Sequence, residues 1–345
     1  MKTALLELHN FAEQIEHDGK WVWSRVPNAV RLELNALAQQ TSFCMSGSEV
    51  RFRMQSDEVT IRFKLANELQ PGAALAEIFH GCFPEPEPDV FLGINPELRI
   101  RKPEKLSLMR AIAEQEDACF NPELVRILLP INANIAEIEL VQGAIAAPLP
   151  EDKPSLRWLA YGSSITHGAS AGLPSSTYAM KTASSLGVDL INLGFPGSAL
   201  LDDAAAAYIA SRTDWDFATL ELGINVKWDV AHNKPVPVSV FEDKLERFLP
   251  HIANAHKDKW IFCIDMFAMQ GDFDGDPLVY PYREAVKKRV KQLNLPRLIH
   301  LDGLELLSQG TGLASDLIHP SNSGMEKISH KLAEVILAHM SPSKV

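Results

Sequence analysis

The chain has 345 residues, of which 46% are hydrophobic and 22% are charged, and these fractions are typical of a globular protein. They exclude a disordered chain, a collagen-like repeat and a coiled-coil rod. The 33 Lys and Arg against 44 Asp and Glu give a formal net charge of -11, without the basic stripe that nucleic-acid binding usually requires.

Nothing in the sequence predicts export or a membrane. The stretch from Met1 to Glu7 has a short apolar patch, far smaller than the core of a signal peptide, and no window reaches the roughly 18 apolar residues of a membrane helix. The cysteines are scattered without a CxxC pair, which favours buried thiols in a reducing cytoplasm over a metal site or a disulfide framework: Cys44, Cys82, Cys119 and Cys263. We therefore expect a cytoplasmic protein without nucleic-acid or membrane partners. The sequence leaves the oligomeric state open.

The first half of the chain is expected to be mainly β-strands. Apolar and polar side chains alternate over 29–34, 125–130 and 135–141, and over 50–64 on both sides of a polar break, which indicates a hairpin. The prolines of 84–88 require a loop. Several short strands without a long amphipathic helix predict a β-sandwich over residues 1–150.

The pattern changes after a proline-rich connection at 147–154. Five apolar runs of strand length, at 156–161, 188–193, 217–222, 260–266 and 297–301, alternate with segments of helical period at 178–186, 204–211, 240–256, 282–293 and 324–340. Such alternation predicts a parallel sheet covered by helices on both faces, over residues 151–345. Ser239 to Glu242 fits a capping box, and Ser321 or Asn322 can cap the last helix.

Residues able to do chemistry follow these predicted strands. Ligands of an open parallel sheet bind beyond the carboxyl ends of the strands. Gly162-Ser163-Ser164 follows the first strand, Gly197 lies after the second and Asn225 after the third, while Asp316 and His319 share a loop before the last helix. An imidazole held by a carboxylate can activate a serine hydroxyl, and backbone N–H groups and a side-chain amide can stabilise an oxyanion. These residues predict an acyl-transfer site.

The second half resembles the SGNH, or GDSL-type, hydrolases. Four blocks carry the resemblance in the right order: Gly162-Ser163-Ser164-Ile165-Thr166, Gly197, Gly223-Ile224-Asn225 and Asp316-Leu317-Ile318-His319. The resemblance implies a three-layer α/β/α, flavodoxin-like domain with a five-stranded parallel sheet. With a β-sandwich of jelly-roll type ahead of it, the chain is similar to bacterial two-domain SGNH esterases and acyltransferases, which act on acylated sugars or other acyl esters.

The resemblance also implies roles. Ser164 is then the nucleophile, His319 the base and Asp316 its partner, while the N–H groups of Ser164 and Gly197 and the amide of Asn225 form the oxyanion hole. The implied activity is a serine esterase, without a metal or other cofactor, acting on small acetyl-type esters of a carbohydrate or similar alcohol. An acyltransferase with the same triad and a non-catalytic carbohydrate-binding protein are the alternatives.

Two positions depart from the family pattern. Ser163 stands where the family usually has Asp before the nucleophile, and Val226 stands where Asp usually follows the Asn. Ser163 is also the alternative nucleophile. His167, one helical turn after Ser164, and Trp228, three residues after Asn225, are further candidates for lining the substrate pocket.

Overall fold

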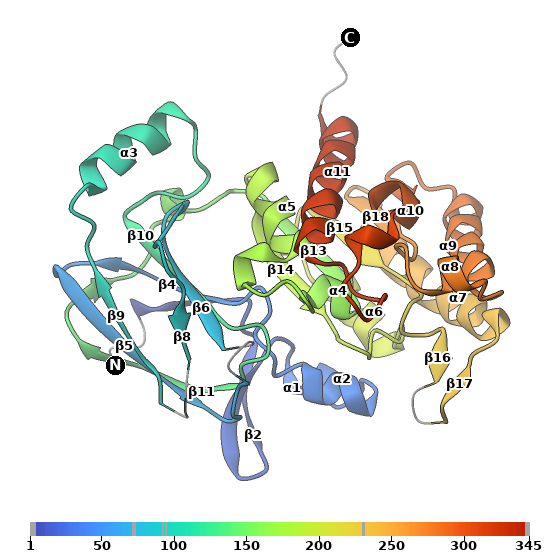
Figure 1. The fold of residues 1–345 in the computed structure, drawn as a ribbon, viewed down its shortest axis with the longest axis horizontal. Coiled ribbons are helices and arrows are strands. Elements are labelled where there is room, and N and C mark those ends of the chain that lie inside the picture. The colour runs from blue at the N-terminus through green and yellow to red at the C-terminus, as the bar shows by residue number, and fades with distance from the viewer. Residues whose placement is uncertain (1–4, 71–73, 92, 94, 230–231, 342–345) are drawn as a thin grey trace.

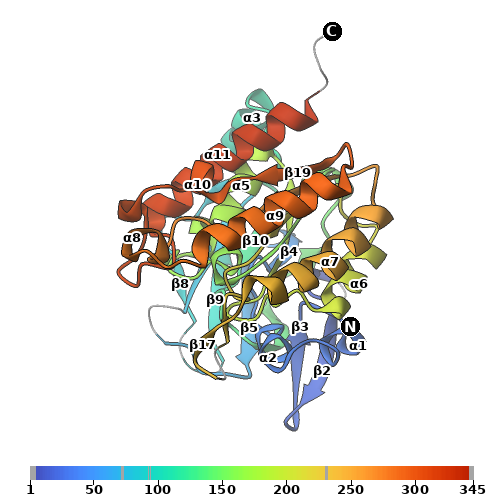
Figure 2. The ribbon, with the colours of Figure 1, turned by 90° about the vertical axis from the view of Figure 1, so that its right-hand side faces the viewer.

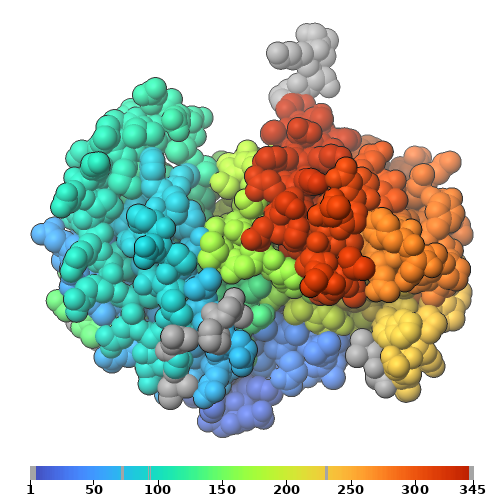
Figure 3. Space-filling view, in the orientation of Figure 1, coloured from blue at the N-terminus to red at the C-terminus, as the bar shows by residue number. Residues whose placement is uncertain are grey.

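The computed structural model describes residues 5–70, 74–91, 93, 95–229 and 232–341. An N-terminal half of antiparallel strands packs beside a C-terminal half in which strands and helices alternate (Figure 1). In Figure 3 the segment with the first two helices extends beneath the C-terminal half. None of the helices in the described ranges is long and apolar enough to cross a membrane.

Two antiparallel sheets form the N-terminal β-sandwich. One has seven strands: β1 (Glu7–His9), β4 (Glu49–Met54), β6 (Leu75–His80), β7 (Phe83–Pro84), β8 (Asp89–Val90), β10 (Leu124–Leu128) and β12 (Ile145–Ala146). The other has three: β5 (Glu58–Leu65), β9 (Glu97–Arg101) and β11 (Ile135–Gln142). Alternate apolar side chains of both sheets meet in one buried core, as expected when each strand has one wet face.

The expected hairpin at 50–64 is wrong, although both of its strands exist. β4 pairs with β1, β10 and β12, whereas β5 pairs with β9 and β11 of the other sheet. The polar break therefore carries the chain from one sheet to the other. Alternation of apolar and polar side chains indicates that one face of a strand is buried, but it does not indicate which strand pairs with it.

Outside the two sheets lie a hairpin and three helices: β2 (Glu13–His17), β3 (Lys20–Ser24), α1 (Asn28–Arg31), α2 (Ala36–Thr41) and α3 (Leu106–Gln115). The strand expected at 29–34 is wrong, because α1 occupies its start. Val30 and Leu34 pack against the core as neighbours four residues apart, and Leu32, which a strand would place with them, is 56% exposed. The ten-residue helix α3 was not anticipated.

The C-terminal half contains a five-stranded parallel sheet in the order β14-β13-β15-β18-β19. Its strands are β13 (Arg157–Gly162), β14 (Asp189–Gly194), β15 (Phe217–Glu221), β18 (Trp260–Ile264) and β19 (Leu298–Leu301). Numbered from β13, the order is 2-1-3-4-5, that of flavodoxin-like folds. The predicted α/β/α fold is confirmed, with each expected strand within a few residues of its observed place.

Helices cover both faces of this sheet. α6 (Asp203–Ser211), α7 (Val238–Ala255) and α9 (Val279–Leu293) share one core with it, and α5 (Tyr178–Leu186) and α11 (Asn322–Met340) share the other. Figure 2 shows α7 and α9 side by side. Shorter elements are α4 (Ser164–His167), α8 (Gly271–Asp274), α10 (Gly303–Leu306), the β16–β17 hairpin (Trp228–Asp229 with Lys234–Pro235) and 3-10 turns at Pro150–Asp152, Pro174–Ser176 and Gly310–Gly312.

Of the two helix N-termini predicted from capping residues, one is confirmed and one is wrong. Ser321 caps α11 by accepting a hydrogen bond from the Gly324 N–H, which confirms one of the two candidates. The capping box at Ser239 is wrong because α7 begins earlier, at Val238, directly after Pro237. Pro237 is therefore the N-cap, and no side chain caps this helix.

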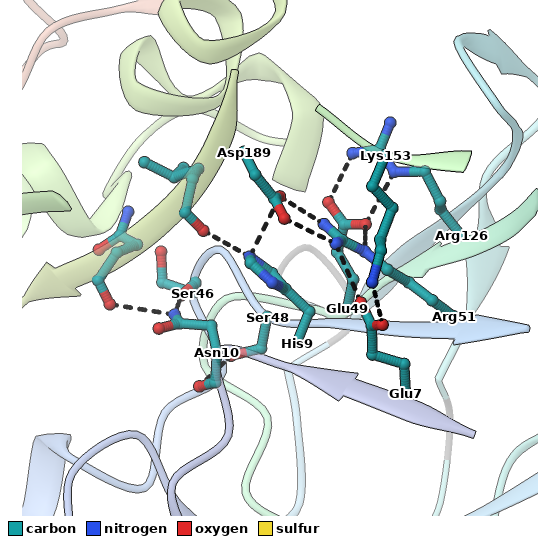
Figure 4. Close-up of polar contacts among 12 residues, drawn as sticks. Glu7, His9, Asn10, Ser46, Ser48, Glu49, Arg51, Arg126, Lys153 and Asp189 are labelled. Carbon is teal, nitrogen blue, oxygen red and sulfur yellow. Dashed lines mark hydrogen bonds and ion pairs between the residues drawn. The ribbon is translucent and has the colours of Figure 1, made fainter. Parts of the chain in front are cut away.

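Buried ion pairs join the two halves (Figure 4). Asp189, the first residue of β14, accepts hydrogen bonds of 2.9 and 2.7 Å from the guanidinium of Arg51 on β4. Glu49 binds Arg51 at 2.8 Å and Arg126 at 2.6 Å, and His9 donates to the Leu190 carbonyl. Burial alone would raise the pKa of Glu49, but Arg126 and Arg51 outweigh it and lower the pKa to about 2. These paired charges fix the β-sandwich against the parallel sheet.

Candidate active site

The turn after β13 exposes Ser164 at the carboxyl edge of the sheet. Ser163 is the N-cap of α4, and its hydroxyl accepts from the Ile165 N–H at 3.1 Å, so Ser164 is the first helical residue. Its own N–H has no acceptor within the helix for this reason. A Cβ at Gly162 would lie 2.2 Å from the Thr166 hydroxyl and 2.5 Å from the Glu221 carboxylate, so the turn requires glycine there.

Glu221, at the end of β15, supports this turn from below. Its carboxylate accepts the Ser163 N–H at 2.6 Å, the Ser163 hydroxyl at 2.7 Å and the Thr166 hydroxyl at 3.0 Å. Burial raises the pKa of Glu221 above its usual range, and these donors oppose the rise. Sequence reasoning missed Glu221. A carboxylate at the end of a strand without other charged residues was the available signal, since a buried carboxylate needs hydrogen-bond donors.

His319 faces Ser164 from the loop before α11. Its Nε2 lies 2.8 Å from the Ser164 hydroxyl, and its Nδ1 lies 2.6 Å from a carboxylate oxygen of Asp316. Because Asp316 accepts the Nδ1 proton, Nε2 is free to accept the serine proton. Burial alone would raise the pKa of Asp316, but hydrogen bonds from the His319 ring and from the His319 and Ile318 backbone lower it. The structure therefore brings Ser164, His319 and Asp316 together.

Gly197 and Asn225 lie beyond the two strands that flank β13. The Asn225 amide oxygen accepts the Ala199 N–H at 3.1 Å, which leaves the amide nitrogen as its free donor. Gly197 has φ +66°, a value that glycine adopts without strain. Among the hydrogen bonds of the described residues, its N–H donates to none. Both residues border one groove.

This groove of about 530 Å³ is largely apolar, and both halves of the chain line it. Leu37 of α2 lies 3.2 Å from the position a Cβ would take on Gly197. Asn35, the N-cap of α2, donates to the Asp202 carboxylate at 2.7 Å and to the Ser198 carbonyl at 2.9 Å, which holds α2 there. Trp228, 44% exposed, forms another part of the lining.

His167 lies elsewhere than expected. It is 1% exposed, and its Nε2 lies 3.0 Å from the Asn132 side chain of the β-sandwich, so it does not line the groove. Burial and the nearby Arg25 lower its pKa to about 3. The helical turn that separates it from Ser164 points it toward the other half of the chain. The sequence around His167 does not indicate a hydrogen-bond partner from that half.

No group of three or more His, Cys, Asp and Glu side chains among the described residues is arranged to hold a metal ion. Residues 160–327, which include Ser164, Asp316 and His319, match the GDSL-like Lipase/Acylhydrolase family. These residues form a GDSL-like lipase/acylhydrolase domain. A comparison with curated protein sequences gives no match.

Several solved structures resemble nearly the whole chain and not only the GDSL-like domain. The salicylyl-acyltransferase SsfX3 from a tetracycline biosynthetic pathway superposes with a TM-score of 0.75 at 21% identity over 97% of this chain and 96% of its own. A Bacteroides ovatus protein described as a GDSL-like lipase gives 0.73 at 19% identity, with 97% and 96% coverage. A family 2 carbohydrate esterase with a carbohydrate-binding domain, from Corynascus thermopiles, gives 0.60 at 18%, with 87% and 95% coverage. At these identities the likeness concerns the fold, and it includes the N-terminal half.

Two departures from the family pattern now have structural settings. Ser163 replaces the usual Asp, and its hydroxyl and N–H bind Glu221 instead of offering a carboxylate of their own. Val226 replaces the second Asp and is buried in the core between sheet and helices. In this GDSL-like domain, therefore, the acidic group beneath the nucleophile turn comes from β15.

Proposed function

We propose that the protein is a serine esterase that cleaves small acyl esters of a carbohydrate or similar alcohol through an acyl-enzyme. The observation that carries this proposal is the chain of hydrogen bonds from the Ser164 hydroxyl through His319 to Asp316, at 2.8 and 2.6 Å. A hydroxyl, an imidazole and a carboxylate in this order are the groups that nucleophilic acyl transfer needs.

In this mechanism the Ser164 oxygen attacks the ester carbonyl while His319 Nε2 takes its proton. The N–H groups of Ser164 and Gly197 and the Asn225 amide stabilise the negative oxygen of the tetrahedral intermediate. His319 then protonates the leaving alcohol, and Asp316 stabilises the imidazolium in both steps. Water activated by the same imidazole hydrolyses the acyl-enzyme and restores Ser164.

The apolar lining of the groove favours a substrate whose acyl group contacts apolar side chains. Leu37, Leu200, Val226 and Trp228 all border it next to the proposed oxyanion donors. An acetyl group fills only a small part of about 530 Å³, so the groove also has room for a longer acyl chain or for the alcohol.

The same groove favours a second candidate, an acyltransferase. Apolar walls contributed by α2 and by the β16–β17 hairpin would reduce access of water to the acyl-enzyme, while an alcohol acceptor occupies the groove. Both reactions share the acyl-enzyme and differ only in the group that accepts the acyl.

The test is hydrolysis of an aryl acetate by the wild type, Ser164→Ala and Ser163→Ala, followed by product analysis with added alcohols. We expect Ser164→Ala to lose activity by several orders of magnitude and Ser163→Ala to keep a measurable part of it. An acyl ester formed with the added alcohol would identify the transferase. If Ser164→Ala matches the wild type, the proposal fails.

A further inference from the structure

Two of the four cysteines lie next to each other at the boundary between the halves. The sulfur atoms of Cys82 and Cys119 are 3.6 Å apart, although the residues are 37 positions apart in the chain. Cys82 lies in the turn between β6 and β7, and Cys119 lies between α3 and β10. Both are free thiols and both are half-buried.

Backbone contacts hold the two segments in this position. The Gly81 N–H donates to the Leu124 carbonyl at 2.8 Å, and a Cβ on Gly81 would lie 2.7 Å from the backbone of Phe120 and Asn121. The turn that carries Cys82 is therefore packed directly on the segment that carries Cys119. Sulfur atoms 3.6 Å apart need only small side-chain movements to reach the roughly 2.05 Å of a disulfide bond.

The two cysteines border a cavity and lie beside a buried guanidinium that also binds Glu49 at 2.6 Å. The guanidinium of Arg126 stacks on the Phe120 ring at 3.7 Å and donates to the Gly81 carbonyl at 3.2 Å, beside Cys82. The contact between the two thiols lowers the pKa of Cys82, helped by Arg126, and raises the pKa of Cys119. Both sulfurs border a cavity of about 230 Å³ between the halves, and the surface is hollowed there (Figure 3).

The geometry points to a peroxide-sensitive dithiol in which Cys82 reacts first and Cys119 closes a reversible disulfide. The Cys82 thiolate attacks one oxygen of hydrogen peroxide, the O–O bond breaks, and a sulfenic acid forms as hydroxide leaves. The Cys119 sulfur, after losing its proton to solvent, attacks the Cys82 sulfur, the S–O bond breaks, and hydroxide leaves and takes up a proton to become water. With hydrogen peroxide, two thiols and one peroxide become one disulfide and two waters.

The remaining cysteines provide internal controls. Cys263 is 0% exposed on β18, and burial raises its pKa; burial also raises the pKa of Cys44. Neither lies within hydrogen-bond distance of another sulfur in the described part of the chain. Reaction at the pair should therefore outpace reaction at these two sites.

The experiment treats the full-length protein with hydrogen peroxide, denatures it and counts alkylatable thiols by intact mass. We expect the wild type to lose two of its four thiols, to recover both with dithiothreitol, and to show a Cys82–Cys119 disulfide in peptide maps. Cys119→Ser should accumulate a dimedone-trapped sulfenic acid at Cys82. Cys82→Ser should keep its three thiols under the same exposure, and the Cys44→Ser/Cys263→Ser variant should form the disulfide as the wild type does.

Either of two results would overturn the inference. One is a wild type that keeps four alkylatable thiols at peroxide doses that oxidise a free model thiol. The other is thiol loss distributed over Cys44 and Cys263 as fast as over the pair. The wild-type result stands without any variant, so a variant that folds poorly cannot obscure it.

Discussion

Replacing Asn225 by Asp tests the proposed oxyanion hole with a change of a single group. The amide oxygen of Asn225 already accepts the Ala199 N–H at 3.1 Å, so the amide nitrogen is the group left to face the groove. In the Asp variant one carboxylate oxygen can keep that contact, while the other places negative charge where the oxyanion develops.

The expected loss of activity follows from the removal of one hydrogen-bond donor to the oxyanion. Removing one oxyanion-hole hydrogen bond typically costs about 100- to 1000-fold in kcat, or roughly 3–4 kcal/mol. Asn225→Ala should show this loss, and Asn225→Asp should lose at least as much because it adds repulsion. KM should change little, since the donor acts mainly on the transition state.

The assay measures kcat and KM for an aryl acetate, with thermal unfolding as a check on the fold. Asn254→Asp is the matched control, because Asn254 is exposed near the end of α7, at the edge of the sheet opposite the site. It should leave kcat unchanged. If Asn225→Asp keeps kcat within about tenfold of the wild type, Asn225 is not an oxyanion donor and the reasoning is refuted.

Three further predictions concern the nucleophile turn, the groove and the buried ion pairs between the halves. Glu221→Ala should lower kcat by about 100-fold, because it leaves the Ser163 donors unpaired and shifts the nucleophile turn. Glu221→Gln should keep most of the activity. Equal kcat values in the two variants would contradict the role of Glu221 in holding this turn. Leu37→Ala should lower kcat/KM for esters of long acyl chains by about tenfold and should have little effect on acetate esters. If kcat/KM depends on acyl-chain length as in the wild type, α2 does not contact the acyl group. The pKa of Glu49, lowered to about 2, implies that stability is fully present above about pH 4.5 and declines as pH falls toward 2, by on the order of 3 kcal/mol in urea unfolding. Glu49→Gln should lose this part of the pH dependence, and a variant with the wild-type slope would count against it.

The α/β half was predictable because its signals are local. Apolar runs bounded by polar residues marked all five strands. The serine, glycine and amide positions follow from where three of these strands end, and the Asp–His pair lies in the loop before the last helix. Ser164 and His319 are 155 positions apart, yet the parallel sheet and the last loop place them at hydrogen-bond distance. The order of the motifs was therefore enough to anticipate their meeting.

The missed features depend on contacts between distant segments. The partner of β4 could not be read from its own alternation, and the alternation over 29–34 predicted a strand where α1 lies. Leu37 reaches the groove because Asn35 docks on Asp202, a contact that joins the two halves. His167 is turned away from the groove by a partner at Asn132. Such residues lack a local sequence signature.

Labelling by a serine-directed fluorophosphonate tests the central claim most directly. The reagent attaches covalently only to a serine that a neighbouring base has activated, and peptide mapping locates it. We predict a single adduct at Ser164 that disappears in His319→Ala while the variant stays folded. An adduct at Ser163 or another serine, or no adduct in a folded wild type, would contradict the Ser164–His319–Asp316 mechanism.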